Sequence, residues 1–204
     1  MIVFTWTRRV GGYSVERGKV LAQPPKKVEV VDFENLDPET VFLSFSQLDG
    51  SPDSIRAFAG TYGLLKNRTW EPLRLWRTEM ESMHRFFKLR SEERWTDAQA
   101  VLLKSMGRQK AVNILPGPDA EDDGIGLFLW PRNLITWLWI QVGLNVKHRS
   151  VRTCRECGKF FLSGGGKANR EKQSRKTQVY CGRKCRNTFN NRLLMKRKAK
   201  EGRR

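Results

Sequence analysis

The four cysteines constrain the fold of this chain more than any other feature. They lie in its last third as two tight pairs, Cys154-x-x-Cys157 and Cys181-x-x-x-Cys185, with 23 residues between the pairs. Zinc binds four thiolates in a tetrahedron, and a short Cys-x-x-Cys turn lets two sulfur atoms approach one ion. The spacing therefore predicts one zinc ion held by all four cysteines. A closed site of this kind leaves no position for a catalytic water, so we expect a structural role.

Other uses of the cysteines stay open. Structural disulfides or free thiols are one alternative, but disulfides need an oxidising compartment. The apolar opening of the chain ends at Arg8 and Arg9, which is not the pattern of a secretory signal peptide, so we expect a cytoplasmic protein. An iron–sulfur cluster is a further alternative, since it also takes four thiolates, usually at a different spacing.

Residues around the cysteines predict a small zinc finger. Gly158 can adopt a positive φ after the first pair, and Phe160 and Phe161 follow in a segment that suits the second strand of a hairpin. Residues 163–176 are rich in glycine and charge, without apolar periodicity, and predict a loop. A helix over about residues 182–200 carries the second cysteine pair at its start. This order of knuckle, hairpin and helix predicts a treble-clef-like finger.

The predicted finger lies in a strongly basic segment. Residues 147–204 contain 20 Lys and Arg against 3 Asp and Glu, so this segment carries +17 of the chain's net charge of +18. Such asymmetry indicates an electrostatic partner, and nucleic acid is our first expectation. Arginine pairs with guanine edges and asparagine with adenine edges, so a helix face that carries both could read bases. The predicted nucleic-acid contacts are Arg183, Lys184, Arg186, Asn187, Asn190, Asn191, Arg197 and Lys198.

At these residues the chain resembles a known family. The string Cys154-Arg-Glu-Cys157-Gly-Lys-Phe160-Phe161, then a polar loop, then Tyr180-Cys181-Gly-Arg-Lys-Cys185-Arg186-Asn187 and a basic helix, is similar to the bacterial CGNR-type zinc fingers. Those fingers close a mostly helical domain called ABATE, in a family regarded as stress-linked transcription regulators. The literal Cys-Gly-Asn-Arg string is absent here. The resemblance covers about residues 150–198 and implies a bacterial regulator whose helical domain senses a small-molecule ligand or mediates oligomerisation.

The residues before the finger predict a separate domain. All seven tryptophans lie between Trp6 and Trp139, and large aromatic residues mark a core. We expect a mainly α fold: a helical domain of residues 1–150 with minor β elements, and the finger in residues 151–204. Within the first domain, residues 2–6 and 18–21 predict two short strands joined through a glycine pair.

Helices in this domain are indicated by capping residues and apolar periodicity. Asp37 before Pro38 and Ser51 before Pro52 are start signals, because their side chains can accept hydrogen bonds from the free N–H groups of a first turn. A helix that is apolar nearly all round is expected to be central. The further predicted elements are helices over residues 73–89, 97–103 and 134–146, the last being the central one, and a hairpin or irregular connection over residues 112–130.

No catalytic constellation is visible in the sequence, so we expect no enzyme activity. Glu81-x-x-His84 places two metal ligands on one helix face, but di-iron bundles need a second such pair. The acidic run over residues 119–123 lacks the spacing of a calcium loop. Polar residues interrupt the most apolar stretch, residues 127–144, and we expect no membrane span.

Taken together, these patterns predict a nucleic-acid-binding zinc-finger protein, with double-stranded DNA as partner and transcription regulation as role. Two alternatives stay open. An RNA-binding or ribosome-associated module would need Phe160, Phe161 or Tyr180 exposed for base stacking. A protein-interaction adaptor would use the basic helix to meet an acidic partner.

Overall fold

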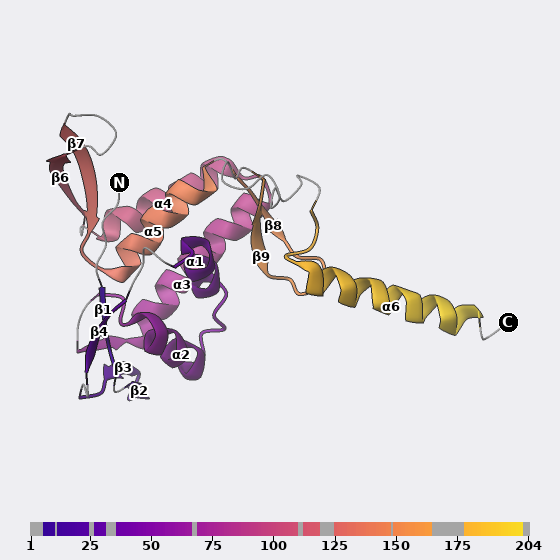
Figure 1. Cartoon of the computed structure of the whole chain (residues 1–204), viewed down its shortest axis with the longest axis horizontal. Helices are drawn as coiled ribbons and strands as arrows, with labels where there is room; N and C mark the ends of the chain where they lie inside the picture. The colour runs from indigo at the N-terminus through magenta and orange to yellow at the C-terminus, as the bar shows by residue number, and fades with distance from the viewer. Residues whose placement is uncertain are drawn as a thin grey trace.

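Figure 1 shows a helical body with small sheets around it and one helix, α6, that projects away from it. The computed structural model describes residues 6–10, 12–24, 27–31, 36–66, 69–109, 112–118, 125–147, 149–164 and 178–201. The helices are α1 (Pro38–Ser46), α2 (Pro52–Tyr62), α3 (Leu73–Ser91), α4 (Trp95–Gln109), α5 (Leu134–Val146) and α6 (Arg183–Glu201). The strands are β1 (Trp6–Arg9), β2 (Tyr13–Glu16), β3 (Lys19–Ala22), β4 (Val28–Val31), β5 (Trp70–Pro72), β6 (Val112–Pro118), β7 (Ile125–Pro131), β8 (Ser150–Thr153) and β9 (Phe160–Ser163).

The expectation of a mainly α fold with minor β elements is wrong. The described residues contain nine strands beside their six helices, and the strands form four separate antiparallel sheets. Three of the sheets have two strands (β1–β4, β6–β7 and β8–β9), and the fourth has the order β2–β3–β5. Most of these strands span only three or four residues, too few for an alternating pattern to stand out in the sequence. The fold is therefore a mixed one, with helices in the core and short sheets around it.

Helix starts follow the local chemistry of the sequence. Asp37 accepts a hydrogen bond from the backbone N–H of the second residue after it, at 3.2 Å, and Ser51 accepts one from the third residue after it, also at 3.2 Å. Both predicted start signals are confirmed by these caps. Asn133 caps α5 in the same way, and Gly63 ends α2 with a φ of 91°. Helix α4 is longer than expected, since it begins at Trp95.

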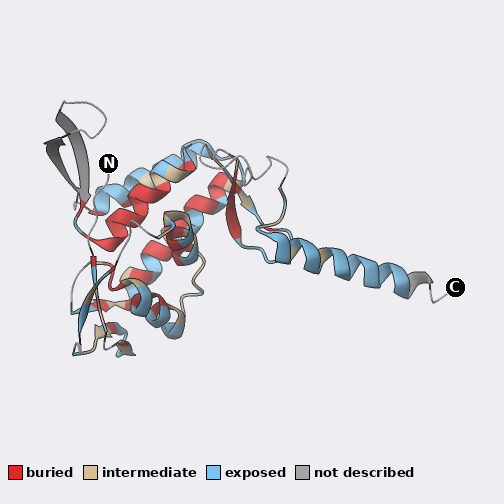
Figure 2. Cartoon of the chain, in the orientation of Figure 1, coloured by how far each residue is buried: buried red, intermediate tan, exposed pale blue. Residues whose placement is uncertain are grey.

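The core lies between α1, α3 and α5, and Figure 2 shows their buried faces in red. As expected, α5 is buried on nearly every side. Among the buried charged side chains is Glu79 of α3, at 2 % exposure. Its carboxylate accepts hydrogen bonds from Trp139 Nε1 and Gln109 Nε2, both at 3.0 Å, with the Arg108 guanidinium 3.5 Å away. These donors join α3, α4 and α5 and offset the cost of burying the charge.

The hairpin β8–β9 packs into the same core. Val151, Phe160 and Leu162 are buried in one apolar cluster with the aromatic residues of the body. The Phe160 ring lies 5.0 Å from the His84 ring and 6.0 Å from the Phe87 ring, both on α3, measured between centroids. The predicted domain boundary after residue 150 thus lies at the start of a hairpin that contributes to the core of the body.

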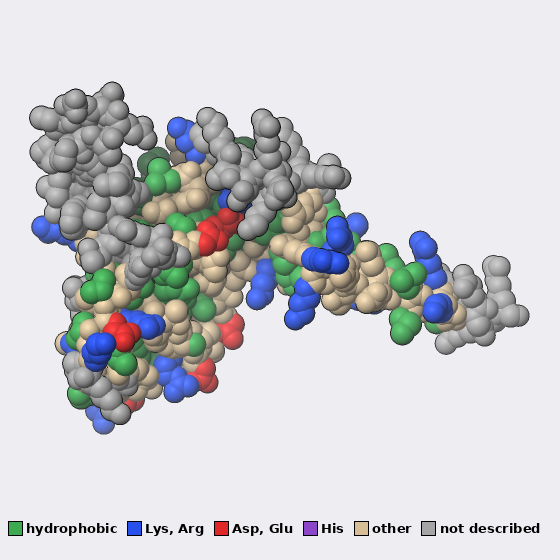
Figure 3. Space-filling model, viewed as in Figure 1, with side chains coloured by type: hydrophobic (Ala, Val, Ile, Leu, Met, Phe, Trp, Pro, Cys, Tyr) green, Lys and Arg blue, Asp and Glu red, His purple; other side chains and the backbone are tan. Residues whose placement is uncertain are grey.

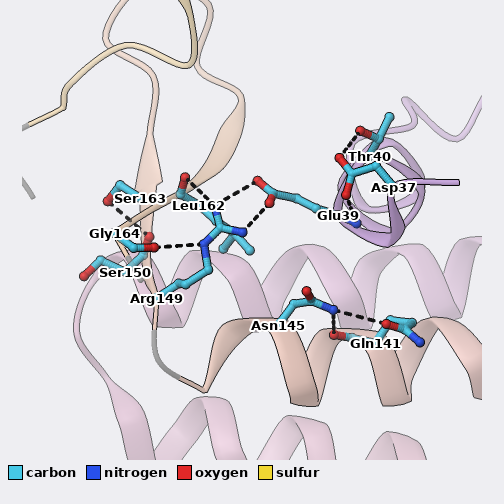
Figure 4. A network of polar contacts seen from close by, with 10 residues as sticks. All are labelled: Asp37, Glu39, Thr40, Gln141, Asn145, Arg149, Ser150, Leu162, Ser163 and Gly164. Carbon is cyan, nitrogen blue, oxygen red and sulfur yellow. Dashed lines mark hydrogen bonds and ion pairs between the residues drawn. The ribbon is translucent and has the colours of Figure 1, made fainter. Parts of the chain in front are cut away.

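Arg149 fixes this hairpin from its edge (Figure 4). Its guanidinium forms an ion pair with Glu39 of α1 and donates to the carbonyl oxygens of Leu162 at 3.3 Å and Gly164 at 3.0 Å. One half-buried arginine therefore connects α1 with the end of β9. Among the helices that the structure describes, none is both long and apolar enough to cross a bilayer.

Candidate metal centre and basic helix

The first cysteine pair lies in the turn of the hairpin. The Cys154 N–H donates to the Lys159 carbonyl at 2.8 Å, and the Gly158 N–H donates to the Cys154 carbonyl at 2.9 Å. Gly158 has a φ of 71°, a conformation that favours glycine. The Arg155 N–H then donates to the Val179 carbonyl at 3.0 Å, which holds the approach to the second pair beside the turn. These backbone hydrogen bonds bring two segments far apart in the sequence side by side.

The second cysteine pair lies at the start of α6, where Cys181 precedes the helix and Cys185 stands in its first turn. The four sulfur atoms all lie within 4.8 Å of one another. Cys181 Sγ is 3.7 Å from Cys157 Sγ and 3.5 Å from Cys185 Sγ. A tetrahedral ion with metal–sulfur bonds of about 2.3 Å places its sulfur ligands about 3.8 Å apart. The predicted ligand set is therefore brought together at a spacing that could hold a metal ion.

The backbone favours negative charge at this cluster. Burial raises the pKa of the Cys154 thiol, but the N–H groups of Cys157, Cys181 and Glu156 donate to its sulfur and lower that pKa to about 6. Burial raises the pKa of Cys181, and the hydrogen bond with Cys185 and the nearby Cys154 raise it further. The negative charge of one thiolate thus disfavours ionisation of the next thiol. A bound cation would remove this repulsion, because it attracts all four sulfur atoms at once.

Three contacts attach α6 to the rest of the finger. Phe189 is half-buried, with its ring centroid 5.4 Å from that of Tyr180, and the Arg155 guanidinium lies 5.9 Å from the Phe189 ring. Arg192, one turn further on, forms an ion pair with Glu156 of the turn. Sequence reasoning missed this ion pair. Its signal was available, because Arg192 follows Cys185 by seven residues, two helical turns along the same face.

Beyond these anchors, α6 is exposed on all sides. We call this projecting helix the arm. Figure 2 shows it in pale blue, and Figure 3 shows Lys and Arg side chains at several points along it. A helix turns by 100° per residue, so Asn187, Asn190, Asn191 and Lys198 lie on the side of α6 opposite Cys185. Arg197 and Lys198 stand near the far end, distant from the cysteines along the arm. The predicted contact residues found exposed on α6 are Arg183, Lys184, Arg186, Asn187, Asn190, Asn191, Arg197 and Lys198.

Two of the three rings suggested for base stacking are buried. Phe160 is 8 % and Phe161 is 6 % exposed, and both belong to β9. Tyr180 is half-buried against Phe189. The two phenylalanines are therefore not available for base stacking, and of the three rings only Tyr180 is partly exposed as the RNA alternative requires.

The structure does not group the other candidate metal ligands, Glu81 and His84, with further ligands among the described residues. Within the described part of the chain, the four cysteines are the one group of three or more Cys, His, Asp or Glu with ligand atoms close enough to hold an ion. Glu81 and His84 lie exposed on α3, and the acidic run over residues 119–123 is outside the described residues. Comparison with protein-family models and with curated proteins finds no match for the chain.

Proposed function

We propose that this protein is a zinc-finger regulator that binds double-stranded DNA through α6. One observation carries the proposal: four clustered cysteines hold the first turn of a helix that is basic, exposed and directed away from the body (Figure 1). The motif resemblance to CGNR-type fingers supports the regulatory role.

Zinc is the metal that this ligand set favours. Four thiolates in a compact tetrahedral arrangement are typical of structural zinc, whose bond length matches the sulfur spacing. Cys154 and Cys157 would hold the ion from the hairpin, and Cys181 and Cys185 from the start of α6. The ion would then supply a rigid link between the body and the basic helix, with no open position for a substrate.

The dimensions and charge of α6 suit the major groove. Its 19 residues extend about 28 Å at 1.5 Å per residue, and a helix about 10–12 Å across fits a groove about 12 Å wide. The helix carries eight Lys and Arg against one Glu. Its arginines and asparagines have the donor and acceptor groups that read guanine and adenine edges, while the lysines suit phosphates.

A protein-interaction role is favoured by a different observation on the same helix. Leu193, Leu194 and Met195 are 42 %, 52 % and 71 % exposed, which is unusual for three consecutive apolar side chains. They lie beyond the anchors of the finger and could contact a protein partner. Their spread around the helix, at 100° per residue, gives no single apolar face, so we rank DNA binding first.

The test is DNA binding by the zinc-loaded protein, measured by fluorescence anisotropy over a series of salt concentrations. If about five to eight cationic groups contact phosphates, log affinity should fall against log salt with a slope of about −5 to −7. Preferred sites selected from random DNA then allow a comparison of variants. Arg186→Ala or Asn187→Ala should weaken a preferred site about tenfold more than random DNA, whereas Lys198→Ala should weaken both alike.

Each outcome bears on a different part of the proposal. Uniform loss in all three variants would remove sequence reading and leave phosphate binding. Absence of any salt-dependent binding to duplex DNA would overturn the proposal and favour the protein-interaction role.

A further inference from the structure

A groove lies between the α1–α2 connection and one side of α3. Its volume is about 640 Å³, within the range of small-molecule sites. The α1–α2 connection contributes one wall through Leu48 and Gly50, and the buried side chain of Met80 lies at its base. The groove is thus large enough for a metabolite and has an apolar floor.

The α3 side of the groove is a stripe of three cationic side chains and one histidine. Arg77, His84, Arg85 and Lys88 recur at helical spacing, so their side chains emerge on one face of α3. No acidic side chain among the described residues forms an ion pair with Arg77, Arg85 or Lys88. By contrast, several other arginines of the body are paired, as Arg149 is with Glu39.

Two carboxylates also line the groove, Asp49 and Glu81. Asp49 is occupied by its own loop: hydrogen bonds from the Ser54 and Ser51 hydroxyls, and from the Ser51 N–H at 2.9 Å, lower its pKa to about 2. Glu81 is exposed on α3. Three side chains that stay positively charged, Arg77, Arg85 and Lys88, therefore line the groove together with two carboxylates. Because one of these carboxylates, Asp49, already accepts hydrogen bonds from its own loop, the groove favours an anion.

His84 adds a directional group. Its Nδ1 lies 3.2 Å from the Ser46 carbonyl, which can only accept, so Nδ1 carries the proton. This contact fixes the ring and leaves Nε2 to accept a hydrogen bond from a ligand hydroxyl group when the ring is neutral, or to donate one to an anionic oxygen when the ring is protonated. The His84 ring also contacts the hairpin, because its centroid lies 5.0 Å from that of Phe160. Gln47 Nε2 donates to the Phe160 carbonyl at 3.3 Å, so the α1–α2 connection contacts the hairpin as well.

From this arrangement we propose that the groove binds a small organic anion, a carboxylate or a phosphate ester with an apolar part. The charged end lies between Arg77, Arg85 and Lys88, and the apolar part lies over Met80. The inference stands on the groove alone and does not require that α6 binds DNA.

The chain contains two histidines, so the imidazole signals of His84 in NMR spectra are readily assigned with a His148→Gln variant. The zinc-loaded full chain is titrated with inorganic phosphate and with succinate, against sodium chloride at equal ionic strength. Both probes should shift the His84 signals in a saturable way, while chloride should not. Arg85→Gln should weaken this binding about tenfold, the loss expected for one charge-assisted hydrogen bond.

Arg74→Gln is the matched control, because Arg74 is exposed on the same helix and does not line the groove. It removes the same charge and should leave the titration unchanged. Equal weakening by Arg74→Gln and Arg85→Gln would overturn the proposal, since it would show a diffuse charge effect. So would His84 signals that respond to a short DNA duplex and not to either small anion, because the groove would then belong to a nucleic-acid surface.

Discussion

Replacing Phe160 with alanine tests whether the hairpin of the finger belongs to the core of the body. The ring is 8 % exposed and packs against Phe87 and His84 of α3. Removing a buried phenylalanine ring usually costs about 3–5 kcal/mol of unfolding free energy. Because His84 on one side is itself exposed, we expect the low end of this range, about 3 kcal/mol.

The measurement is thermal unfolding of the zinc-loaded protein, followed by the fluorescence of its tryptophans. All seven of them precede the finger, so the signal reports on the body. A loss of about 3 kcal/mol should lower the melting temperature by about 6–12 °C for a chain of this size. A finger with a separate core predicts no change in this transition.

Phe189→Ala is the matched control. It deletes the same ring from the finger, where the ring contacts of Phe189 among the described residues are with Tyr180 and Arg155. Its melting temperature by tryptophan fluorescence should stay within about 2 °C of the wild type, since changes away from the core have small effects. If Phe160→Ala behaves like Phe189→Ala, the packing of β9 on α3 does not contribute to stability, and the reasoning is refuted.

Two further predictions concern the metal and the arm. Cys185→Ser should reduce bound zinc below about half an equivalent. In hydrogen exchange, the amides of α6 should lose protection while those of β8–β9 keep it, because the hairpin packs on the body. Equal loss of protection in both segments would contradict this. A chain that ends at Leu193 keeps the anchors of α6 but loses all the basic residues after Leu193. Its zinc content and melting temperature should not change, while the slope of log affinity for DNA against log salt should become shallower by about 2–3. An unchanged slope would place the phosphate contacts elsewhere.

Local signals in the sequence predicted most helix boundaries of this fold. Asp37 and Ser51 cap their helices because a side chain and the N–H groups it binds lie within three residues of each other. The pairing of strands could not be predicted in the same way. Residues 2–6 and 18–21 were expected to form two short strands joined through a glycine pair. Residues 2–5 lie outside the described residues, β3 (Lys19–Ala22) lies between β2 and β5, and β1 pairs with β4. Partner choice depends on contacts between distant segments, which four-residue strands do not encode locally.

The candidate metal site was predictable because its ligands are chemically distinctive and closely spaced. The four cysteines predicted one site, and the structure gathers all four sulfurs. The attachment of the hairpin to α3 was not predictable, because Phe160 could equally have covered the finger alone. The groove beside it was also missed. Its cationic stripe is visible in the sequence of α3, but only the α1–α2 connection across from it makes the stripe a concave site.

The two halves of the finger are held by different forces. The hairpin is rooted in the body by buried rings and by the Arg149–Glu39 ion pair, neither of which involves a cysteine. Helix α6 meets the hairpin turn through the cysteines, the half-buried Phe189 and one ion pair, whose arginine is largely exposed to solvent. The cysteine cluster is therefore the main constraint on the direction of the basic helix. Any DNA geometry that depends on the relation of α6 to the body depends on the occupancy of that cluster.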